Sequence, residues 1–254
     1  MHLTVLGSGT SHPHPTRSST SFWLETAKGS VLLDCSAASI HRMAQERLPW
    51  AELDAIWISH FHLDHIGGLA PFLFGIEHAA EIRDRRKPLT ICGHLGLREL
   101  FDAIDSAGNY RLLEQNFPVD IVEVAEGDAF RLIDGISASV HKTPHKPESL
   151  AIRLDDGERT VCYTSDTGFD PTIGEFAAGA DLFIVESSFV ANKSVDKHLQ
   201  LSDAMGLISI AEPRQALLNH LYPEWDDVNF EDLAGGFSPP CEVLLAFDGM
   251  KIDV

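Results

Sequence analysis

Four potential metal ligands lie within six residues of the sequence, at His60, His62, Asp64 and His65. They follow the apolar run 53–58, which is typical of a buried strand. Buried imidazole and carboxylate groups need partners, and a divalent metal ion gives one to each of them. The alternation of His60 and His62 sends both rings to one side of an extended segment, and Asp64-His65 then turns toward a neighbouring position. One loop can therefore supply ligands to two ions, as two-metal hydrolysis requires.

The order of these four residues resembles the His-x-His-x-Asp-His signature of the metallo-β-lactamase superfamily, and later residues extend the resemblance over almost the whole chain. The resemblance implies an α+β fold, the αββα sandwich, in which two mixed β-sheets pack face to face and are flanked by helices. It places the site at one edge between the sheets. Composition alone does not distinguish this fold from a doubly wound sheet. We expect a single hydrolase domain over residues 1–254.

Short apolar runs, typical of strands, alternate along the chain with segments whose apolar residues have helical spacing. These strands and helices must position the ligands. Strands are expected at residues 3–6, 21–25, 31–34, 55–59, 89–92, 121–124, 136–142, 150–154, 160–164, 182–186, 216–219 and 243–247. Helices are expected over residues 37–45, from residue 69, over 96–104 and over 202–211. The last of these has apolar residues at helical spacing and is expected to end before Pro213.

The composition is that of a globular protein, with 44% hydrophobic and 22% charged residues. The net charge of −19 argues against a broad electropositive groove for nucleic acid. No apolar segment reaches the roughly 18 residues of a membrane span, and no signal peptide is evident. We expect a soluble cytoplasmic protein with scattered, buried cysteines, which are Cys35, Cys92, Cys162 and Cys241.

Two metal ions need more ligands than one loop provides, and the resemblance implies three more. His145 precedes a strand as in ribonuclease Z-like members, although His141 is a rival. Asp166 matches the Ser/Gly-Asp-Thr turn of the superfamily, and a turn cap is the alternative. His220 matches the last histidine of the superfamily and follows the run 216–219.

The resulting assignment places the ligands at two sites that share one carboxylate. Site one would take His60, His62 and His145, site two would take Asp64, His65 and His220, and Asp166 would bridge the two ions. Imidazole and carboxylate suit zinc, with manganese or iron as alternatives. Two such ions would ionise a bridging water, and the resulting hydroxide would be the nucleophile, oriented by Asp64.

Three further residues resemble supporting groups of the superfamily. Asp34 resembles the aspartate that steadies a ligand histidine, and a strand-ending turn residue is the alternative. His198 occupies the place of a histidine implicated in ribonuclease Z-like phosphodiesterases as an acid or transition-state stabiliser. Glu186 resembles the acidic residue that orients it. An imidazolium beside a carboxylate would keep its proton better near pH 7.

The pattern around these residues is closer to phosphodiesterases than to true β-lactamases. The first hypothesis is a small organic or cyclic phosphodiester as substrate, and the alternative is tRNA 3′-end processing. Ribonuclease Z often grips tRNA with a long arm between its third and fourth motifs. Here His145 and Asp166 are only 166 − 145 = 21 residues apart, which leaves room for a hairpin and no arm. A lactonase, a carboxylester hydrolase and a metal-binding module without activity stay open.

The expected partner is therefore a small-molecule phosphodiester, with nucleic acid disfavoured and no membrane. The basic run of residues 83–87 is expected to be a solvated face. The segment 73–86 mixes phenylalanine, isoleucine and charged residues, so it is a candidate lid or homodimer contact.

Overall fold

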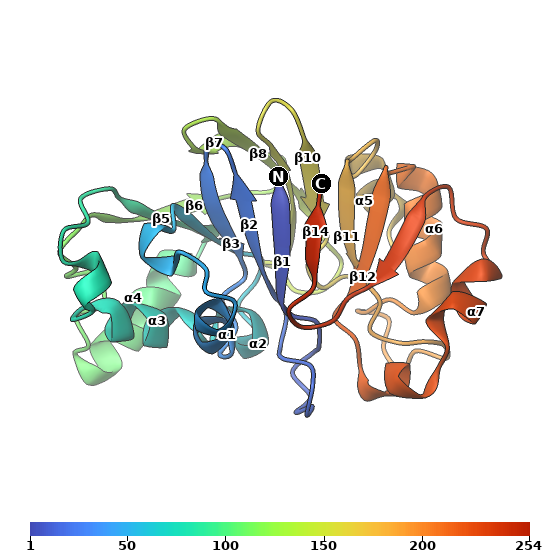
Figure 1. Ribbon diagram of the computed structural model, residues 1–254, viewed down its shortest axis with the longest axis horizontal. Coiled ribbons are helices and arrows are strands. Elements are labelled where there is room, and N and C mark those ends of the chain that lie inside the picture. The colour runs from blue at the N-terminus through green and yellow to red at the C-terminus, as the bar shows by residue number, and fades with distance from the viewer.

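Two seven-stranded β-sheets pack against each other in the computed structural model, which describes residues 1–254 (Figure 1). The first sheet has the order β14-β1-β2-β3-β4-β5-β6 and the second the order β13-β12-β11-β10-β9-β8-β7. The strands of the first sheet are β1 (His2–Gly7), β2 (Ser21–Thr26), β3 (Gly29–Leu33), β4 (Ala55–Ile58), β5 (Leu89–His94), β6 (Val119–Val124) and β14 (Lys251–Asp253). Those of the second are β7 (Ala129–Ile133), β8 (Ile136–Lys142), β9 (Leu150–Asp155), β10 (Thr160–Tyr163), β11 (Leu182–Glu186), β12 (Gln215–Asn219) and β13 (Glu242–Leu245).

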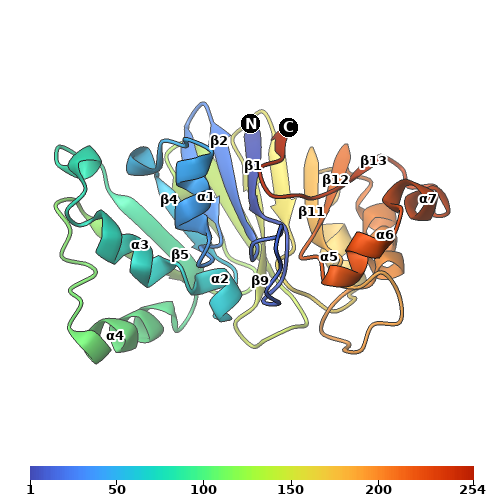
Figure 2. The same ribbon diagram turned by 60° about the horizontal axis from the view of Figure 1, so that its bottom comes forward.

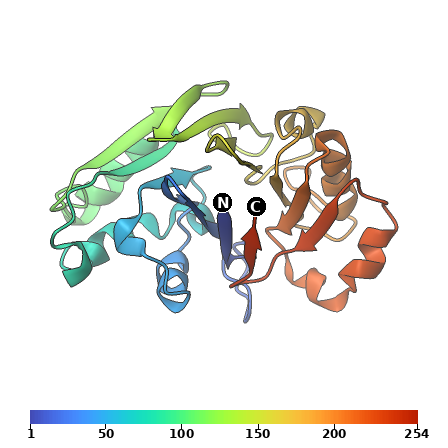
Figure 3. The same cartoon turned by 45° about the horizontal axis from the view of Figure 1, so that its top comes forward.

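Helices cover the outer side of each sheet (Figure 3). The first sheet carries α1 (Ser39–Gln45), α2 (Leu63–Ile66), α3 (Leu69–Ile76) and α4 (Leu97–Gly108). The second carries α5 (Pro171–Phe176), α6 (Leu201–Ala211) and α7 (Phe230–Gly235). Short 3₁₀ helices occupy Trp50–Glu52, Ala80–Ile82 and Pro223–Asp227. The predicted αββα sandwich is confirmed. None of the helices has both the length and the apolar composition that crossing a membrane requires.

The sequence of β4 is continuously apolar because both faces of this strand are buried. Ala55 and Trp57 face the core between the sheets, whereas Ile56 and Ile58 face the core under the helices. Because side chains of a strand alternate between the two faces of the sheet, a strand that is covered on both faces has no polar position. This arrangement holds the end of β4, and the ligand loop that follows it, on a rigid base.

Both sheets are mixed, and their parallel parts bring strand ends together. Strands β3 to β6 are parallel to one another, as are β10 to β13. The hairpin expected between the third and fourth motifs is present as the antiparallel pair of β9 and β10. The loops after β4, β8, β10, β11 and β12 leave the sandwich at its lower edge in Figure 1, and these loops carry the predicted site residues.

The basic run 83–87 is a solvated face, as expected, at Arg83, Arg86 and Lys87, but not at Arg85. Arg85 is buried, with 7% of its surface exposed, and its guanidinium donates to the backbone carbonyls of Ala51, Leu53, Lys87 and Pro88. Its neighbour Arg83 is exposed. Arg85 therefore fastens a loop to the domain and is not available to bind phosphate groups.

Candidate metal centre

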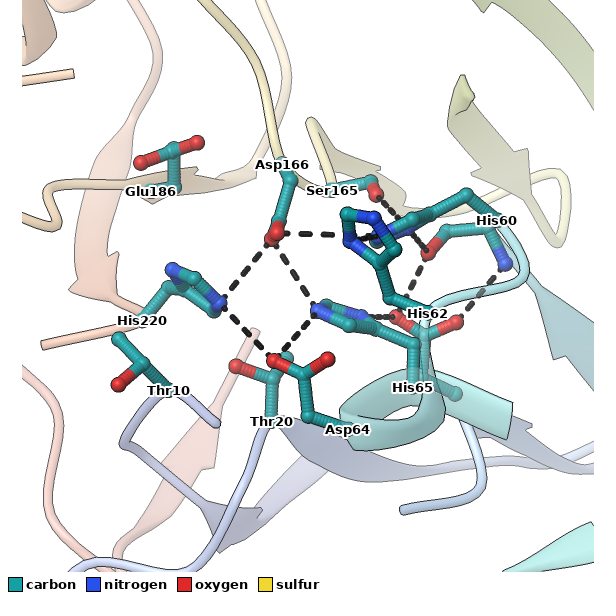
Figure 4. Close-up of polar contacts among 12 residues, drawn as sticks. Thr10, Thr20, His60, His62, Asp64, His65, Ser165, Asp166, Glu186 and His220 are labelled. Atoms are coloured by element: carbon teal, nitrogen blue, oxygen red, sulfur yellow. Dashed lines mark hydrogen bonds and ion pairs between the residues drawn. The ribbon is translucent and has the colours of Figure 1, made fainter. Parts of the chain in front are cut away.

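The seven predicted ligands come together in two groups. Figure 4 shows all of them except His145, which is not labelled there. The ligand atoms of His60, His62, His145 and Asp166 all lie within 4.8 Å of one another. Those of Asp64, His65 and His220 form a second group that meets the same limit. His62 and Asp64 are half-buried and the other five are buried. Four separate loops of the chain thus supply two neighbouring clusters, with the members predicted from the sequence.

Asp166 lies between the two clusters and presents one oxygen to each. Its Oδ2 is 3.7 Å from Nε2 of His60 and 3.7 Å from Nε2 of His145. Its Oδ1 is 3.2 Å from Nε2 of His65 and 3.3 Å from Nε2 of His220. A carboxylate with this division of its oxygens can coordinate two ions at once.

Several buried atoms in the centre have no hydrogen-bond partner. They are Nε2 of His65, Nε2 of His220 and Oδ1 of Asp166. A buried polar atom without a partner costs about 1–3 kcal/mol, so three that converge on one point call for a ligand. A divalent cation satisfies all three, and the donor set of imidazole nitrogens and carboxylate oxygens suits zinc.

Ring nitrogens converge in the first cluster as well. The Nδ1 atom of His62 lies 3.0 Å from Nε2 of His60 and 3.2 Å from Nε2 of His145. Nitrogens about 2.0–2.1 Å from a tetrahedral zinc ion lie roughly 3.3 Å from each other. The spacing of the three rings therefore fits a cation between them.

The remaining ring nitrogens fix which atom of each histidine faces the centre. Nδ1 of His145 donates to the carbonyl of Lys197 (3.0 Å), and Nδ1 of His220 contacts Oγ of Ser188 (2.9 Å), whose proton goes to Glu186. Nδ1 of His60 lies 3.1 Å from Oγ of Ser59, which donates to Asp34. In these three rings Nδ1 thus carries the proton and the Nε2 lone pair points inward, whereas His62 presents its Nδ1 to the cluster.

Asp34 orients His65 in the same way. It is fully buried at the end of β3, and its φ of 58° turns the chain there. Its Oδ2 accepts hydrogen bonds from Nδ1 of His65 (2.7 Å), the hydroxyl of Tyr163 (2.7 Å) and Oγ of Ser59 (2.9 Å). Its Oδ1 accepts from the backbone N–H of Ser59 (2.8 Å). Asp34 therefore has both of the roles considered from the sequence. It lies in the turn that ends β3, and its carboxylate orients the ring of His65.

Burial and charge set the protonation of the ligands. Burial lowers the pKa of His60 well below its usual range and also lowers the pKa of His145, so both rings are neutral, as metal binding requires. Burial opposes ionisation of Asp166, but His220 and His65 outweigh it and hold the pKa of that carboxyl well below its usual range. Asp166 is therefore ionised.

His198 borders the centre and is paired with Glu186. Its Nδ1 donates to Oε1 of Glu186 at 3.0 Å, and its ring stacks on His220 with centroids 5.3 Å apart. Burial lowers the pKa of His198, but the Glu186 carboxylate raises it further, to about 9. The ring carries a positive charge at neutral pH. Its Nδ1–H binds Glu186, and its Nε2–H takes no part in this ion pair.

Glu186 is held by more than His198. It also accepts hydrogen bonds from the backbone N–H of Thr167 (2.6 Å), Oγ of Ser188 (2.6 Å) and the backbone N–H of Leu199 (3.1 Å). Ser188 therefore connects Glu186 to the ring of His220. Ser188 and Tyr163 were not predicted from the sequence, and the only signal for either residue is a position at or just beyond the end of a strand.

Three other histidines, including the rival His141, lie outside the centre. His141 bonds with Thr172 and stacks on Phe176, which leaves His145 as the histidine of this loop in the cluster. His12 contacts the carbonyl of Pro13, and His14 pairs with Asp226. All three make contacts at the surface or in loops.

The sequence matches the family described as the beta-lactamase superfamily domain over residues 30–221, which is more than half of the chain. The chain belongs to the beta-lactamase superfamily. The prediction of a metal-dependent hydrolase of this superfamily is confirmed.

The chain is 26% identical over 223 residues to a probable metallo-hydrolase, YhfI, of Bacillus subtilis, covering 87% of both chains. It is also 26% identical over 307 residues to ribonuclease Z of Shouchella clausii, covering 98% of this chain and 95% of the other.

Solved structures agree with the superfamily fold. The crystal structure of YhfI from Bacillus subtilis superimposes with a TM-score of 0.82 at 23% identity and 99% coverage of both chains. The short form of human tRNase Z gives 0.78 at 20% identity, covering all of this chain and 99% of the other. A diphosphatase from the PhnP family gives 0.76 at 19% identity, covering all of this chain and 97% of the other. At these identities the superpositions establish the fold.

Proposed function

We propose that the protein is a dinuclear zinc phosphodiesterase that hydrolyses a small organic or cyclic phosphodiester. The observation that carries this proposal is the division of the Asp166 oxygens between two clusters of ligand atoms. In this assignment His60, His62 and His145 would hold one ion, Asp64, His65 and His220 would hold the other, and Asp166 would contribute an oxygen to each. Manganese and iron would use the same donors.

The bound ions would supply an ionised water molecule and neutralise the charge that develops on the phosphoryl oxygens. The chain contributes the orientation of the reacting groups. Asp64 is half-buried beside His65 and His220, with Oδ2 at 3.7 Å from Nε2 of each ring, and so borders the space where the attacking oxygen would lie. It would orient that oxygen toward phosphorus.

His198 is the proposed proton donor. Its Nδ1 is occupied by Glu186, so Nε2–H is the proton that can reach the leaving-group oxygen. Its positive charge would also stabilise the additional negative charge of the transition state. Glu186 acts as a positioning residue, because its bonds to Thr167 and Leu199 fix the carboxylate that holds the ring.

The short connection between β8 and Asp166 and the net charge of −19 favour a small substrate over tRNA. The buried position of Arg85 removes one cation from the set that could contact a nucleic acid. Two relatives named above are a ribonuclease Z and a tRNase Z, so tRNA 3′-end processing is the second candidate. Lactone or carboxylester hydrolysis is the third, because the same ions polarise a carbonyl.

A three-substrate assay tests the proposal with the zinc-loaded protein. The panel contains bis-p-nitrophenyl phosphate, a set of lactones and a labelled precursor tRNA. We expect turnover of the phosphodiester, and we expect His198→Ala to lower its kcat roughly 10²–10⁴-fold with the zinc content unchanged. His141→Ala is the matched control and should keep full activity. Turnover of lactones alone, or of precursor tRNA at physiological salt, would contradict the proposal.

A further inference from the structure

A glycine two residues beyond Asp166 lies where three loops of the candidate metal centre meet. The N–H of Gly168 donates to the carbonyl of Pro144 (3.2 Å), which precedes a ligand histidine. A methyl group at Gly168 would lie 2.3 Å from the carbonyl oxygen of Asp196, a separation that Cβ atoms do not tolerate. His198 follows two residues after Asp196. The loops after β8, β10 and β11 therefore meet here through backbone atoms alone.

This contact, and not an unusual backbone conformation, requires glycine at position 168. Gly168 is not among the glycines with positive φ, so an alanine could adopt its backbone conformation. The atoms that a methyl group would meet first belong to the backbone of Asp196 and Pro144. A backbone carbonyl cannot rotate aside as the end of a long side chain can. A larger residue at this position therefore has to displace one of the adjoining loops.

The loop around Asp196 is the one that can move. Residues 190–199 form neither helix nor strand, and they appear as the long loop below α5 and α6 in Figure 2. Residues 194–197 are exposed. On the other side of the contact Thr143 is fully buried, and its hydroxyl donates to the carbonyl of Asp166 (3.0 Å). Because exposed loops are displaced at lower cost than buried, hydrogen-bonded ones, a clash at Gly168 would shift Asp196 and the residues after it.

We propose that Gly168 is a positioning residue, which lets residues 196–198 pack against the loop of Asp166 and so holds His198 within reach of the leaving group. The inference rests on the proposed function. In that reaction the water oxygen bonds to phosphorus, the bond from phosphorus to the leaving-group oxygen breaks, and a proton passes from Nε2 of His198 to that oxygen. Proton transfer needs a hydrogen bond of about 2.6–3.2 Å, whereas attraction between charges declines slowly with distance. A displaced His198 would therefore lose its effect as an acid before its effect as a cation.

Two methyl esters with different leaving groups test the proposal. For zinc-loaded Gly168→Ala we expect kcat for methyl phenyl phosphate to fall roughly 10²-fold, because phenolate is strongly basic and needs the proton. Methyl p-nitrophenyl phosphate has a weakly basic leaving group, so its kcat should fall by about fivefold or less. KM and zinc content should stay unchanged. Gly235→Ala, at an exposed glycine of α7 with no atom near its missing methyl group, should change neither rate.

A second variant tests the same contact from the other side and does not introduce a clash. Asp196→Gly loosens the backbone of the exposed loop, so we expect the phenyl ester to lose about three- to tenfold in kcat and the p-nitrophenyl ester to lose less. Asp196→Asn removes only the charge and should change neither rate. An equal loss for both esters in Gly168→Ala, or equal behaviour of the two Asp196 variants, would overturn the proposal. Loss of zinc from Gly168→Ala would also overturn it, because the contact would then serve the metal ligands.

Crystal structures of the zinc-loaded proteins separate this inference from the proposed function. Nδ1 of His198 lies 3.0 Å from Oε1 of Glu186, and we expect Gly168→Ala to break this hydrogen bond. If His198 moves in the variant but the unmodified protein hydrolyses neither ester, Gly168 still positions His198 and the phosphodiesterase fails. If the unmodified protein hydrolyses both esters and His198 keeps its place in the variant, the role of Gly168 fails alone.

Discussion

At the scale of single residues, Asp34 shows how a group that would not touch the ions can determine metal binding. It holds the Nδ1 proton of His65 and so aims Nε2 at Asp166. We expect Asp34→Asn to weaken zinc binding roughly 10–100-fold, measured by competition with a chromophoric chelator. Because an amide brings its own N–H groups against the donors of Ser59 and Tyr163, we also expect about 1–3 kcal/mol less free energy of unfolding.

A surface aspartate provides the control for this variant. Asp134→Asn removes a carboxylate whose side chain is 98% exposed, and it should change neither zinc affinity nor stability. If Asp34→Asn lowered stability but kept the zinc affinity of the unmodified protein, the carboxylate would serve only the turn at the end of β3.

The members of the two clusters could be predicted because their types and order are rare. Four ligands in six residues carry their own signal, and His145, Asp166 and His220 follow from the superfamily resemblance. Ser188 and Tyr163 carry no such signal, since serine and tyrosine occur everywhere and their roles come only from contacts made in the folded chain. His141 and His145 are separated only by folding, because one turns toward Phe176 and the other toward the centre.

At the scale of elements, the connection between α2 and α3 depends on Gly68. Its N–H donates to the carbonyl of Cys35, and a methyl group at Gly68 would lie 2.1 Å from the carbonyl oxygen of Ser36. Gly68→Ala should therefore displace α2, which carries Asp64 and His65. We expect a loss of about 1–3 kcal/mol of stability together with weaker zinc binding, measured by thermal unfolding and chelator competition.

The matched control lies in the next helix. Gly75 of α3 has no atom near its missing methyl group, so Gly75→Ala should raise stability by about 0.5–1 kcal/mol and leave zinc binding unchanged. Equal behaviour of the two alanine variants would show that the contact with Ser36 does not position α2.

The loop fastened by Arg85 gives a second prediction at this scale. Arg85→Ala leaves four backbone carbonyls without their donor, so we expect a loss of at least about 2 kcal/mol in the free energy of unfolding by urea. Arg83→Ala, at an exposed neighbour, should be neutral. Since Arg85 lies away from the ligands, kcat at a temperature where the variant is folded should be unchanged, and a large drop in kcat would assign it another role.

Strands such as β3, β4 and β11 were predictable because a strand buried on both faces appears in the sequence as a continuous apolar run. The twelve expected strands correspond to β1–β6 and β8–β13. The strand β7 was missed because alternate residues are exposed, and β14 was missed because only three residues pair with β1. The helices α5 and α7 have six residues each, which is too short for a helical stripe to stand out. The end of α6 at Ala211 agrees with the expectation set by Pro213.

At the scale of the whole molecule, the two sheets can share the centre only while they stay together. We propose that residues 1–254 form one cooperative unit, since the core between the sheets takes side chains from both. Calorimetry should give one transition with equal calorimetric and van't Hoff enthalpies. Two separate transitions would mean that the sheets unfold independently.

Removal of metal should lower the stability of this unit. An ion that binds only the folded state stabilises it by about 2.7 kcal/mol at one hundred times its dissociation constant. We therefore expect a chelator to lower the Tm by several degrees and added zinc to restore it. A variant in which His65 and His220 are replaced by alanine should show a much smaller shift, and a Tm insensitive to chelator in the unmodified protein would argue against resident ions.

The hydrogen bond from His145 to the carbonyl of Lys197 connects a proposed metal ligand to the segment that carries the proposed proton donor, His198. Lys197 is the neighbour of His198, so the ring that would grip the first ion also steadies the backbone that presents the proton donor. If His145 binds a cation and His198 is the proton donor, as proposed, this hydrogen bond would couple metal binding to the placement of the acid.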